Sequence, residues 1–205
     1  MRAAAKRLVQ LVAIIMVAPL GLAELFLRRV FHRDVCFKGQ GEILCLVPGL
    51  TGSYFRNAYY WMTLERCPLD CFIGIGSVFT RSGAVVGHRV YIGAFSRAGL
   101  VTIGDDVLLA DHVQILSGKH QHRFSDPSQR MQDQPRLATR VHIGTNSWVG
   151  AGSIVMADVG ANCVLGAGSI VVNPIPDNMI AVGNPARVLR GTYEKSAAVS
   201  DKQDS

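Results

Sequence analysis

The chain has little charge and few aromatic residues, 18% and 7% of its 205 positions. Its five cysteines show no zinc-type spacing, and Cys67 and Cys71 are one residue too far apart for a CxxC redox motif. It has no Gly-x-Ser-x-Gly nucleophile elbow and no cysteine beside a histidine. These absences argue against a zinc module, a dithiol oxidoreductase and a covalent acyl-enzyme mechanism. They favour reduced thiols in a cytosolic fold.

The basic excess is confined to the N-terminus. Seven of the 21 Lys and Arg residues, but only two of the 15 acidic residues, lie in residues 1–38, so the rest of the chain is almost neutral. This excess surrounds an apolar segment at residues 8–27. It therefore indicates an anionic membrane surface rather than a nucleic acid.

Residues 8–27 have about the length of a helix that could cross a bilayer. Pro19 and Gly21 predict a kink or a break in that helix. A secretory signal is disfavoured, because no small-x-small cleavage site precedes Arg28. A narrow stripe of polar and small residues along one side could face lipid headgroups or another helix. The stripe consists of Lys6, Gln10, Ala13, Val17, Gly21, Glu24 and Arg28.

An apolar residue, often followed by a small one, recurs every six residues through most of the chain. Residues 143–171 carry it at Ile143, Val149, Val155, Val159, Leu165 and Val171, with a slip of two after Val155. Upstream it falls at Ile73, Phe79, Val85, Ile92, Ala98, Ile103, Leu109 and Ile115. This period is neither helical nor a strand alternation. It predicts an all-β parallel solenoid in which each short face supplies one inward aliphatic residue and small residues form the corners.

Two stretches interrupt this pattern. Residues 117–140 form a polar excursion with turn signals and no helical period, which is a position where functional loops occur. Residues 35–70 form a connecting and capping region. There we expect short strands at 36–39 and 43–47, then a helix or an aromatic arm over 57–66 that caps the first coil or lies at a membrane interface. The polar tail, 191–205, is expected to be disordered.

Together these features resemble the hexapeptide-repeat acyltransferases over residues 71–190. The motifs that carry the resemblance are Ile-Gly-Asp-Asp-Val at 103–107, Ser-Gly-Lys-His-Gln-His at 117–122 and Gly-Asn-Pro-Ala at 183–186. The last is similar to the closing signature of maltose, galactoside and exopolysaccharide O-acetyltransferases. The resemblance implies a left-handed parallel β-helix with a short C-terminal cap, here preceded by an apolar helical anchor at residues 1–34. It also implies a homotrimer with sites between neighbouring chains, acetyl-CoA as co-substrate and no metal.

The resemblance places the general base at His120 or His122. A sugar hydroxyl is a poor nucleophile, and a neutral imidazole can take its proton as it attacks a thioester. Ser117 or a backbone N–H would stabilise the oxyanion. Where galactoside-type enzymes have an acceptor-binding Asn this chain has Ala94, so Asp111 or Ser96 would support the acceptor instead.

The resemblance also implies that pantetheine lies along a groove between coils and that a basic residue meets the nucleotide phosphates. The matching positions are Trp148, Ala151, Gly152, Ala167, Gly168, Ser169, Arg187 and Arg190. Simple corner packing would explain the Ala and Gly residues equally well.

The function implied is transfer of acetyl to a hydroxyl of a cell-surface polysaccharide precursor, nucleotide-linked or polyprenyl-linked, at the cytoplasmic face of the membrane. The membrane surface would bind residues 1–34, through a monotopic or re-entrant anchor or through a helix that crosses with its N-terminus outside. No nucleic acid is expected. The alternatives are an acyltransferase for an amino sugar or an antibiotic-type acceptor, and a non-catalytic scaffold.

Overall fold

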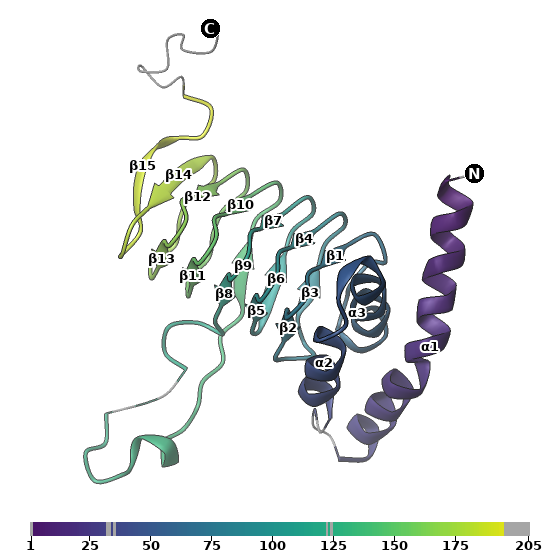
Figure 1. Ribbon diagram of the computed structural model, residues 1–205. Coiled ribbons are helices and arrows are strands. Elements are labelled where there is room, and N and C mark those ends of the chain that lie inside the picture. The colour runs from purple at the N-terminus through teal and green to yellow at the C-terminus, as the bar shows by residue number, and fades with distance from the viewer. Residues whose placement is uncertain (1, 32–33, 35, 122, 124, 195–205) are drawn as a thin grey trace, which may run out of the picture.

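Three helices precede a stack of short strands (Figure 1). The computed structural model describes residues 2–31, 34, 36–121, 123 and 125–194. The helices are α1 (Arg2–Phe31), α2 (Phe37–Cys45) and α3 (Gly49–Thr63). Because α1 continues through Pro19 while its axis bends in Figure 1, the proline kinks this helix without ending it.

The strands that follow are two to five residues long, and a 3₁₀ helix, η1 (Met131–Asp133), lies in the excursion. The strands are β1 (Phe72–Ile73), β2 (Val78–Phe79), β3 (Val85–Val86), β4 (Tyr91–Ile92), β5 (Arg97–Ala98), β6 (Val101–Ile103), β7 (Leu108–Leu109), β8 (Gln114–Ile115), β9 (Val141–Ile143), β10 (Trp148–Val149), β11 (Ile154–Val155), β12 (Val164–Leu165), β13 (Ile170–Val171), β14 (Met179–Val182) and β15 (Arg187–Gly191).

The chain visits three sheets in turn. Their strand orders are β1-β4-β7-β10-β12-β14-β15, β13-β11-β8-β5-β2 and β3-β6-β9. Phe72 pairs with Tyr91 and Trp148 pairs with Val164, so one coil takes 19 residues near the start and 16 near the end. The parallel strands predicted from the six-residue period are confirmed. The exception is β15, which pairs antiparallel with β14 and ends the stack. We call residues 72–182 without the excursion the coil stack.

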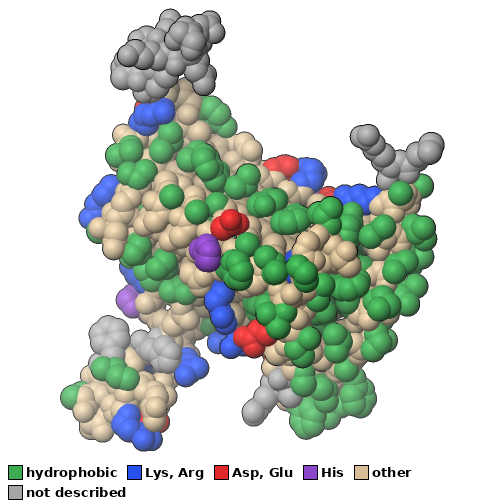
Figure 2. Space-filling model, in the orientation of Figure 1, with side chains coloured by type: hydrophobic (Ala, Val, Ile, Leu, Met, Phe, Trp, Pro, Cys, Tyr) green, Lys and Arg blue, Asp and Glu red, His purple; other side chains and the backbone are tan. Residues whose placement is uncertain are grey.

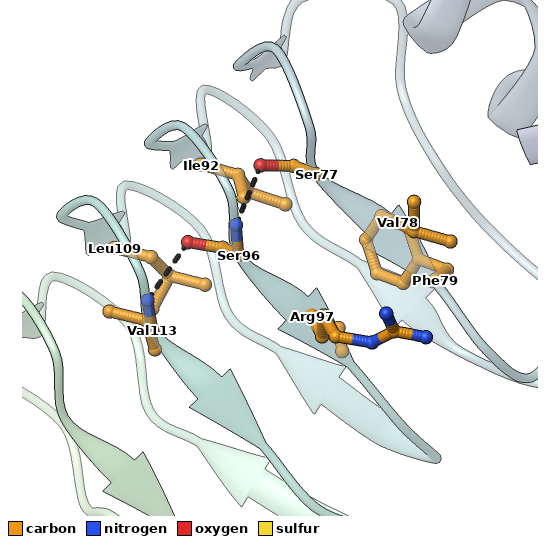
Figure 3. A pocket seen from close by; sticks show the side chains of 9 residues that line it. Ser77, Val78, Phe79, Ile92, Ser96, Arg97, Leu109 and Val113 are labelled. Carbon is orange, nitrogen blue, oxygen red and sulfur yellow. Dashed lines mark hydrogen bonds between the residues drawn. The ribbon is translucent and has the colours of Figure 1, made fainter. Parts of the chain in front are cut away.

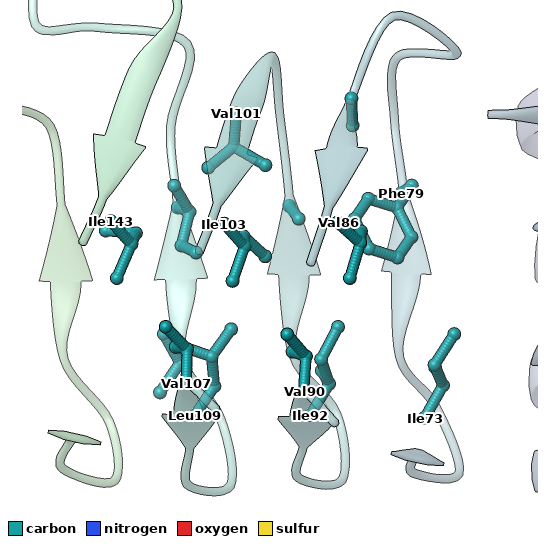
Figure 4. Close-up of a cluster of buried hydrophobic side chains, with 14 of the residues drawn as sticks. Ile73, Phe79, Val86, Val90, Ile92, Val101, Ile103, Val107, Leu109 and Ile143 are labelled. Carbon is teal, nitrogen blue, oxygen red and sulfur yellow. The ribbon is translucent and has the colours of Figure 1, made fainter. Parts of the chain in front are cut away.

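Aliphatic side chains fill the interior of the coil stack (Figure 4). At every predicted inward position but one the side chain is buried. The exception is Val85, which is only half-buried, whereas the next residue, Val86, is completely buried. The first coil is the longer one, so an extra residue falls between Phe79 and the third face. A strict period of six cannot reveal that residue.

Residues 37–45 are helical, so the prediction of short strands at 36–39 and 43–47 is wrong. The buried residues of α2 are Phe37, Gly41, Leu44 and Cys45, which follow one another at the spacing of a single helix face. Two short apolar runs can be read as strands, because the helical period appears only when the residues between them are counted.

The last helix before the strands, α3, covers the open end of the first coil (Figure 1). Tyr59 and Tyr60 are fully buried, and the ring of Tyr60 meets that of Phe79 edge-on at 4.9 Å between centroids. The buried guanidinium of Arg56 donates hydrogen bonds to three carbonyl oxygens, those of Leu44, Val47 and Ile73. The aromatic segment therefore caps the coil stack, although Trp61 remains exposed.

Candidate functional site

The excursion leaves and rejoins the coil stack on a two-chain stem. Three backbone hydrogen bonds form its rungs: Thr139 N to Ser117 O at 3.0 Å, Leu137 N to Gln121 O at 3.0 Å and Arg123 N to Pro135 O at 3.1 Å. Gly118 starts the stem with a φ of 81°, a conformation that favours glycine. A Cβ on Gly118 would also lie 2.9 Å from the Cβ of Thr139. His120 is thus held between the first two rungs.

The side chain of His120 is exposed and lines a cavity of about 300 Å³. One wall of the cavity is the stem with the start of β9. The other is made by the two corners that follow β11 and β13. Besides His120, the polar residues of the lining are Lys119, Thr139, Arg140 and Asp158. An imidazole therefore stands beside a space that can hold a small substrate group.

The corner after β11 is the one where the six-residue period slips. Only three residues, from Met156 to Asp158, separate Val155 from the inward residue Val159. The carboxylate of Asp158 accepts the N–H of His142 in the preceding coil at 2.8 Å, which fixes this corner. The imidazole Nδ1 of His142 lies 3.3 Å from the same oxygen. The slip thus shapes one wall of the cavity.

Arg140 enters the cavity at the base of the stem. Its Nη1 donates to Thr102 Oγ1 at 3.2 Å, and its Nη2 donates to Glu65 Oε2 at 3.0 Å. These bonds orient the guanidinium against the three-stranded sheet. With Lys119 it adds positive charge beside His120, while Asp158 supplies the negative group of the lining. The cavity can therefore hold a polar or anionic group next to a proton acceptor.

Ser117 and Ser96 both serve the backbone. Ser117 is buried, and its Oγ accepts the N–H of Leu100 at 2.8 Å. Ser96 is buried behind a different edge, where its Oγ accepts the N–H of Val113 at 3.0 Å (Figure 3). Asp111 lies on that same edge and accepts the N–H of Ala94 at 2.7 Å. Neither Ser96 nor Asp111 is among the residues that line the cavity at His120.

The predicted donor residues lie mainly on the edge between the seven-stranded and five-stranded sheets. Ala151 and Gly152 follow β10 and Ala167 and Gly168 follow β12, with Gly168 N bonded to Ala151 O at 2.8 Å. A Cβ on Gly152 or Gly168 would meet no described atom within 4 Å, so this edge is open. Within one chain it is separated from His120 by the five-stranded sheet.

The other donor positions differ in exposure. Trp148 is half exposed on the outer face of β10. Ser169 is completely buried and donates to the carbonyl oxygen of Gly166 at 2.6 Å, so its hydroxyl is used inside the coil. Arg187 is exposed on β15, and Arg190 bonds to the carbonyl oxygens of Gly191 and Glu194.

His122 lies outside the described residues. Within the part of the chain that the structure describes, no group of three or more His, Cys, Asp or Glu side chains could hold a metal ion.

Sequence reasoning did not single out Lys119, Arg140 or Asp158. The slip after Val155 pointed to an altered corner there, but a pattern along the chain cannot show which excursion folds against that corner.

The repeat of the coil stack matches a known family model. Residues 140–173 match the family model described as the hexapeptide repeat of succinyl-transferase. The resemblance to the hexapeptide-repeat acyltransferases is therefore confirmed, and the chain carries the repeat of that family.

Two of the curated relatives that the chain matches are named as acetyltransferases. A probable acetyltransferase of Mycobacterium tuberculosis is 38% identical over 48% of this chain and 34% of its own length. A putative acetyltransferase of Dictyostelium discoideum is 42% identical over 47% of this chain and 50% of its own length. The chain thus spans half or less of the length of these curated relatives. Among solved structures, the polySia-specific acetyltransferase NeuO is 25% identical with a TM-score of 0.50, covering 63% of each chain.

Proposed function

We propose that this protein is an O-acetyltransferase that moves acetyl from acetyl-CoA to a hydroxyl of a cell-surface polysaccharide precursor. The observation that carries the proposal is the position of His120, an exposed imidazole fixed on the stem of the excursion at a cavity of about 300 Å³. The acetyltransferase relatives and the polysaccharide-modifying neighbour support the reaction class.

In the proposed reaction the acceptor oxygen attacks the thioester carbonyl carbon while His120 takes the hydroxyl proton. The tetrahedral intermediate then collapses, the C–S bond breaks, and the imidazolium returns its proton to the leaving sulfur as CoA departs. Help of this kind typically contributes about 10² to 10⁴ fold, and the rest comes from holding both substrates together. Lys119 and Arg140 would favour an acceptor with a negative group, such as a sugar phosphate or a sugar carboxylate.

The proposal includes a left-handed coil and a trimer. In one chain, opposite ends of the strands in the five-stranded sheet carry the two parts of the site. The open edge at Ala151 and Gly152 lies where these strands begin, and the cavity at His120 lies where they end. A trimer would place the donor edge of one chain against the cavity of the next. Acetyl-CoA would then be held by one chain and deprotonation carried out by its neighbour. Because acetyl-CoA is cytosolic, the domain would work at the cytoplasmic face of the membrane.

The test is release of free CoA by detergent-purified protein offered nucleotide-linked and polyprenyl-linked saccharides. We expect His120→Ala to lower turnover at least 100-fold. The matched control is His88→Ala, which removes a half-buried histidine paired with Asp70 in another coil and should leave turnover nearly unchanged.

His122→Ala is made in parallel. Loss of turnover in His122→Ala but not in His120→Ala would move the base to His122. Full activity in both variants would contradict base-assisted attack by a hydroxyl, and activity with amino sugars alone would support N-acyl transfer instead.

A further inference from the structure

One side of α1 is packed against the rest of the protein. Ala13 and Val17 are buried, and a Cβ on Gly21 would come within 2.9 Å of the side chain of Met62 in α3. Gln10 Nε2 donates to the carbonyl oxygen of Leu69 at 2.7 Å. The polar and small stripe of the sequence therefore faces protein, not lipid headgroups.

The polar residues at the far end of the stripe are also used inside the protein. Glu24 has none of its surface exposed, and its carboxylate accepts the backbone N–H of Cys36 at 3.1 Å. Arg28 pairs with Glu24 at 3.4 Å and donates to the carbonyl oxygen of Thr63 at 3.0 Å. Moving α1 away from α3 would break the bond from Arg28 to Thr63 and expose the Glu24–Arg28 pair.

The opposite side of α1 is apolar and open. By length and composition residues 4–31 could cross a membrane. The exposed large apolar side chains are Leu8, Val9, Leu11, Val12, Ile15, Met16, Leu22, Leu25, Phe26, Val30 and Phe31. Three further large apolar side chains are exposed around the turn from α2 to α3. They are Ile43 in α2, Leu46 between the helices and Leu50 in α3. Figure 2 shows hydrophobic side chains gathered along the edge of the molecule that α1 forms. A patch of this extent on a protein marks an interaction surface.

Exposed basic side chains accompany this face. Arg7 lies near one end of α1, Arg29 lies near the other, and Lys38 is the second residue of the next helix. Positive charge around an apolar helix face is the complement of a bilayer with anionic headgroups.

We propose that α1 lies in the plane of an anionic bilayer, with its open face among the acyl chains and its stripe docked on α3, so that the protein is monotopic. This inference does not depend on acetyl transfer, and it makes the proposed membrane location specific. A crossing helix would carry Gln10 and Glu24 into hydrocarbon, away from their backbone partners at Leu69 and Cys36.

The docked helix fixes how the coil stack stands on the membrane. α1 runs across the N-terminal end of the stack, with α3 between it and β1 (Figure 1). Its open face therefore points away from the coils, which extend into the cytosol. The corner after β11 lies three strand spacings beyond β2 in the five-stranded sheet, which is roughly 15 Å. The cavity at His120 is thus raised above the lipid headgroups.

The first experiment is flotation of the full-length protein, purified in detergent and then diluted below its critical micelle concentration, with vesicles of phosphatidylcholine alone or with about 30% phosphatidylglycerol. We expect binding that is stronger with phosphatidylglycerol and falls at least tenfold in the triple variant Ile15→Gln, Leu22→Gln, Phe26→Gln. The matched control, Met131→Gln, Leu137→Gln, Leu189→Gln, removes similarly exposed apolar side chains elsewhere and should bind like wild type. Unchanged binding by the α1 variant, or a stable soluble dimer in place of vesicle binding, would overturn the proposal.

The second experiment distinguishes a helix α1 that lies in the plane of the bilayer from one that crosses it. Leu8→Trp, Ile15→Trp and Phe26→Trp are placed in vesicles of lipids brominated at different acyl positions, and wild-type signal from Trp61 and Trp148 is subtracted. A helix in the plane gives the same shallow depth at all three positions. A clearly greater depth for Ile15→Trp than for the other two would show a crossing helix and contradict the inference. Neither experiment measures turnover. Failure of the membrane proposal can therefore be distinguished from failure of the transferase proposal.

Discussion

The side-chain amide of Gln10 donates a hydrogen bond to the carbonyl oxygen of Leu69 at 2.7 Å, across 59 residues of chain. It joins the N-terminal helix to the segment that leads into the first coil. Because it is made to backbone, its strength does not depend on the identity of residue 69.

We expect Gln10→Leu to lower the free energy of unfolding by about 1 kcal/mol, because the change keeps apolar bulk but removes the donor. Urea denaturation of the detergent-solubilised protein measures this. Gln132→Leu, at an exposed position of η1, is the control and should change stability little. Equal stability of both variants would mean that the docking bond contributes nothing.

Gly144 lies at a close approach of two coil backbones. A Cβ there would lie 2.3 Å from the backbone nitrogen of Ala161, which cannot move without shifting the next coil. We expect Gly144→Ala to destabilise the protein by about 3 kcal/mol or more. Gly39→Ala, in α2 with open space around it, should stabilise by up to about 1 kcal/mol. Thermal unfolding compares the two, and a tolerated Gly144→Ala would contradict the tight coil contact.

Gly118 positions the stem that carries His120. An alanine would be strained at its φ of 81° and would press on Thr139, so we expect the stem to shift. If His120 is the base, Gly118→Ala should lower kcat by about 10 to 100 fold. Gly49→Ala, at the start of α3 with a φ of 68° but open space, is the control for backbone strain alone. Steady-state CoA release measures both variants, and equal effects would argue against a role for the stem.

Arg89 forms two hydrogen bonds with Asp106, at 2.6 Å each, and holds the pKa of that carboxyl below its usual value. A carboxyl with a lowered folded-state pKa stabilises the fold above its unfolded pKa of about 3.9, and this stabilisation is lost as pH falls through the folded value. Asp106→Asn keeps a residue type that tolerates the φ of 59° found there.

Urea denaturation should therefore give a higher free energy of unfolding for wild type than for Asp106→Asn at pH 6. This difference in stability should vanish at acid pH and shrink in high salt. A difference that persists at pH 2 would assign it to packing instead.

The six-residue period determined the coil stack, because each short face must supply one apolar side chain to a shared interior. It located the inward residues correctly from Ile92 onward, and it exposed the short corner after Val155. The motif at 117–122 also placed a histidine where the structure has a cavity. These are local regularities, and a sequence displays them directly.

Only the tertiary structure decided what depends on contacts between distant segments. It brought Arg140 and Asp158 to the cavity wall beside His120, because the excursion folds back against the corner at 156–158, more than thirty residues beyond His120. It also joined residues 37–45 into one helix and turned the polar stripe of α1 onto α3. The sequence itself determined that residues 8–27 are apolar with one polar side. Which side meets protein and which is left open depended on where α3 and Leu69 lie in the fold.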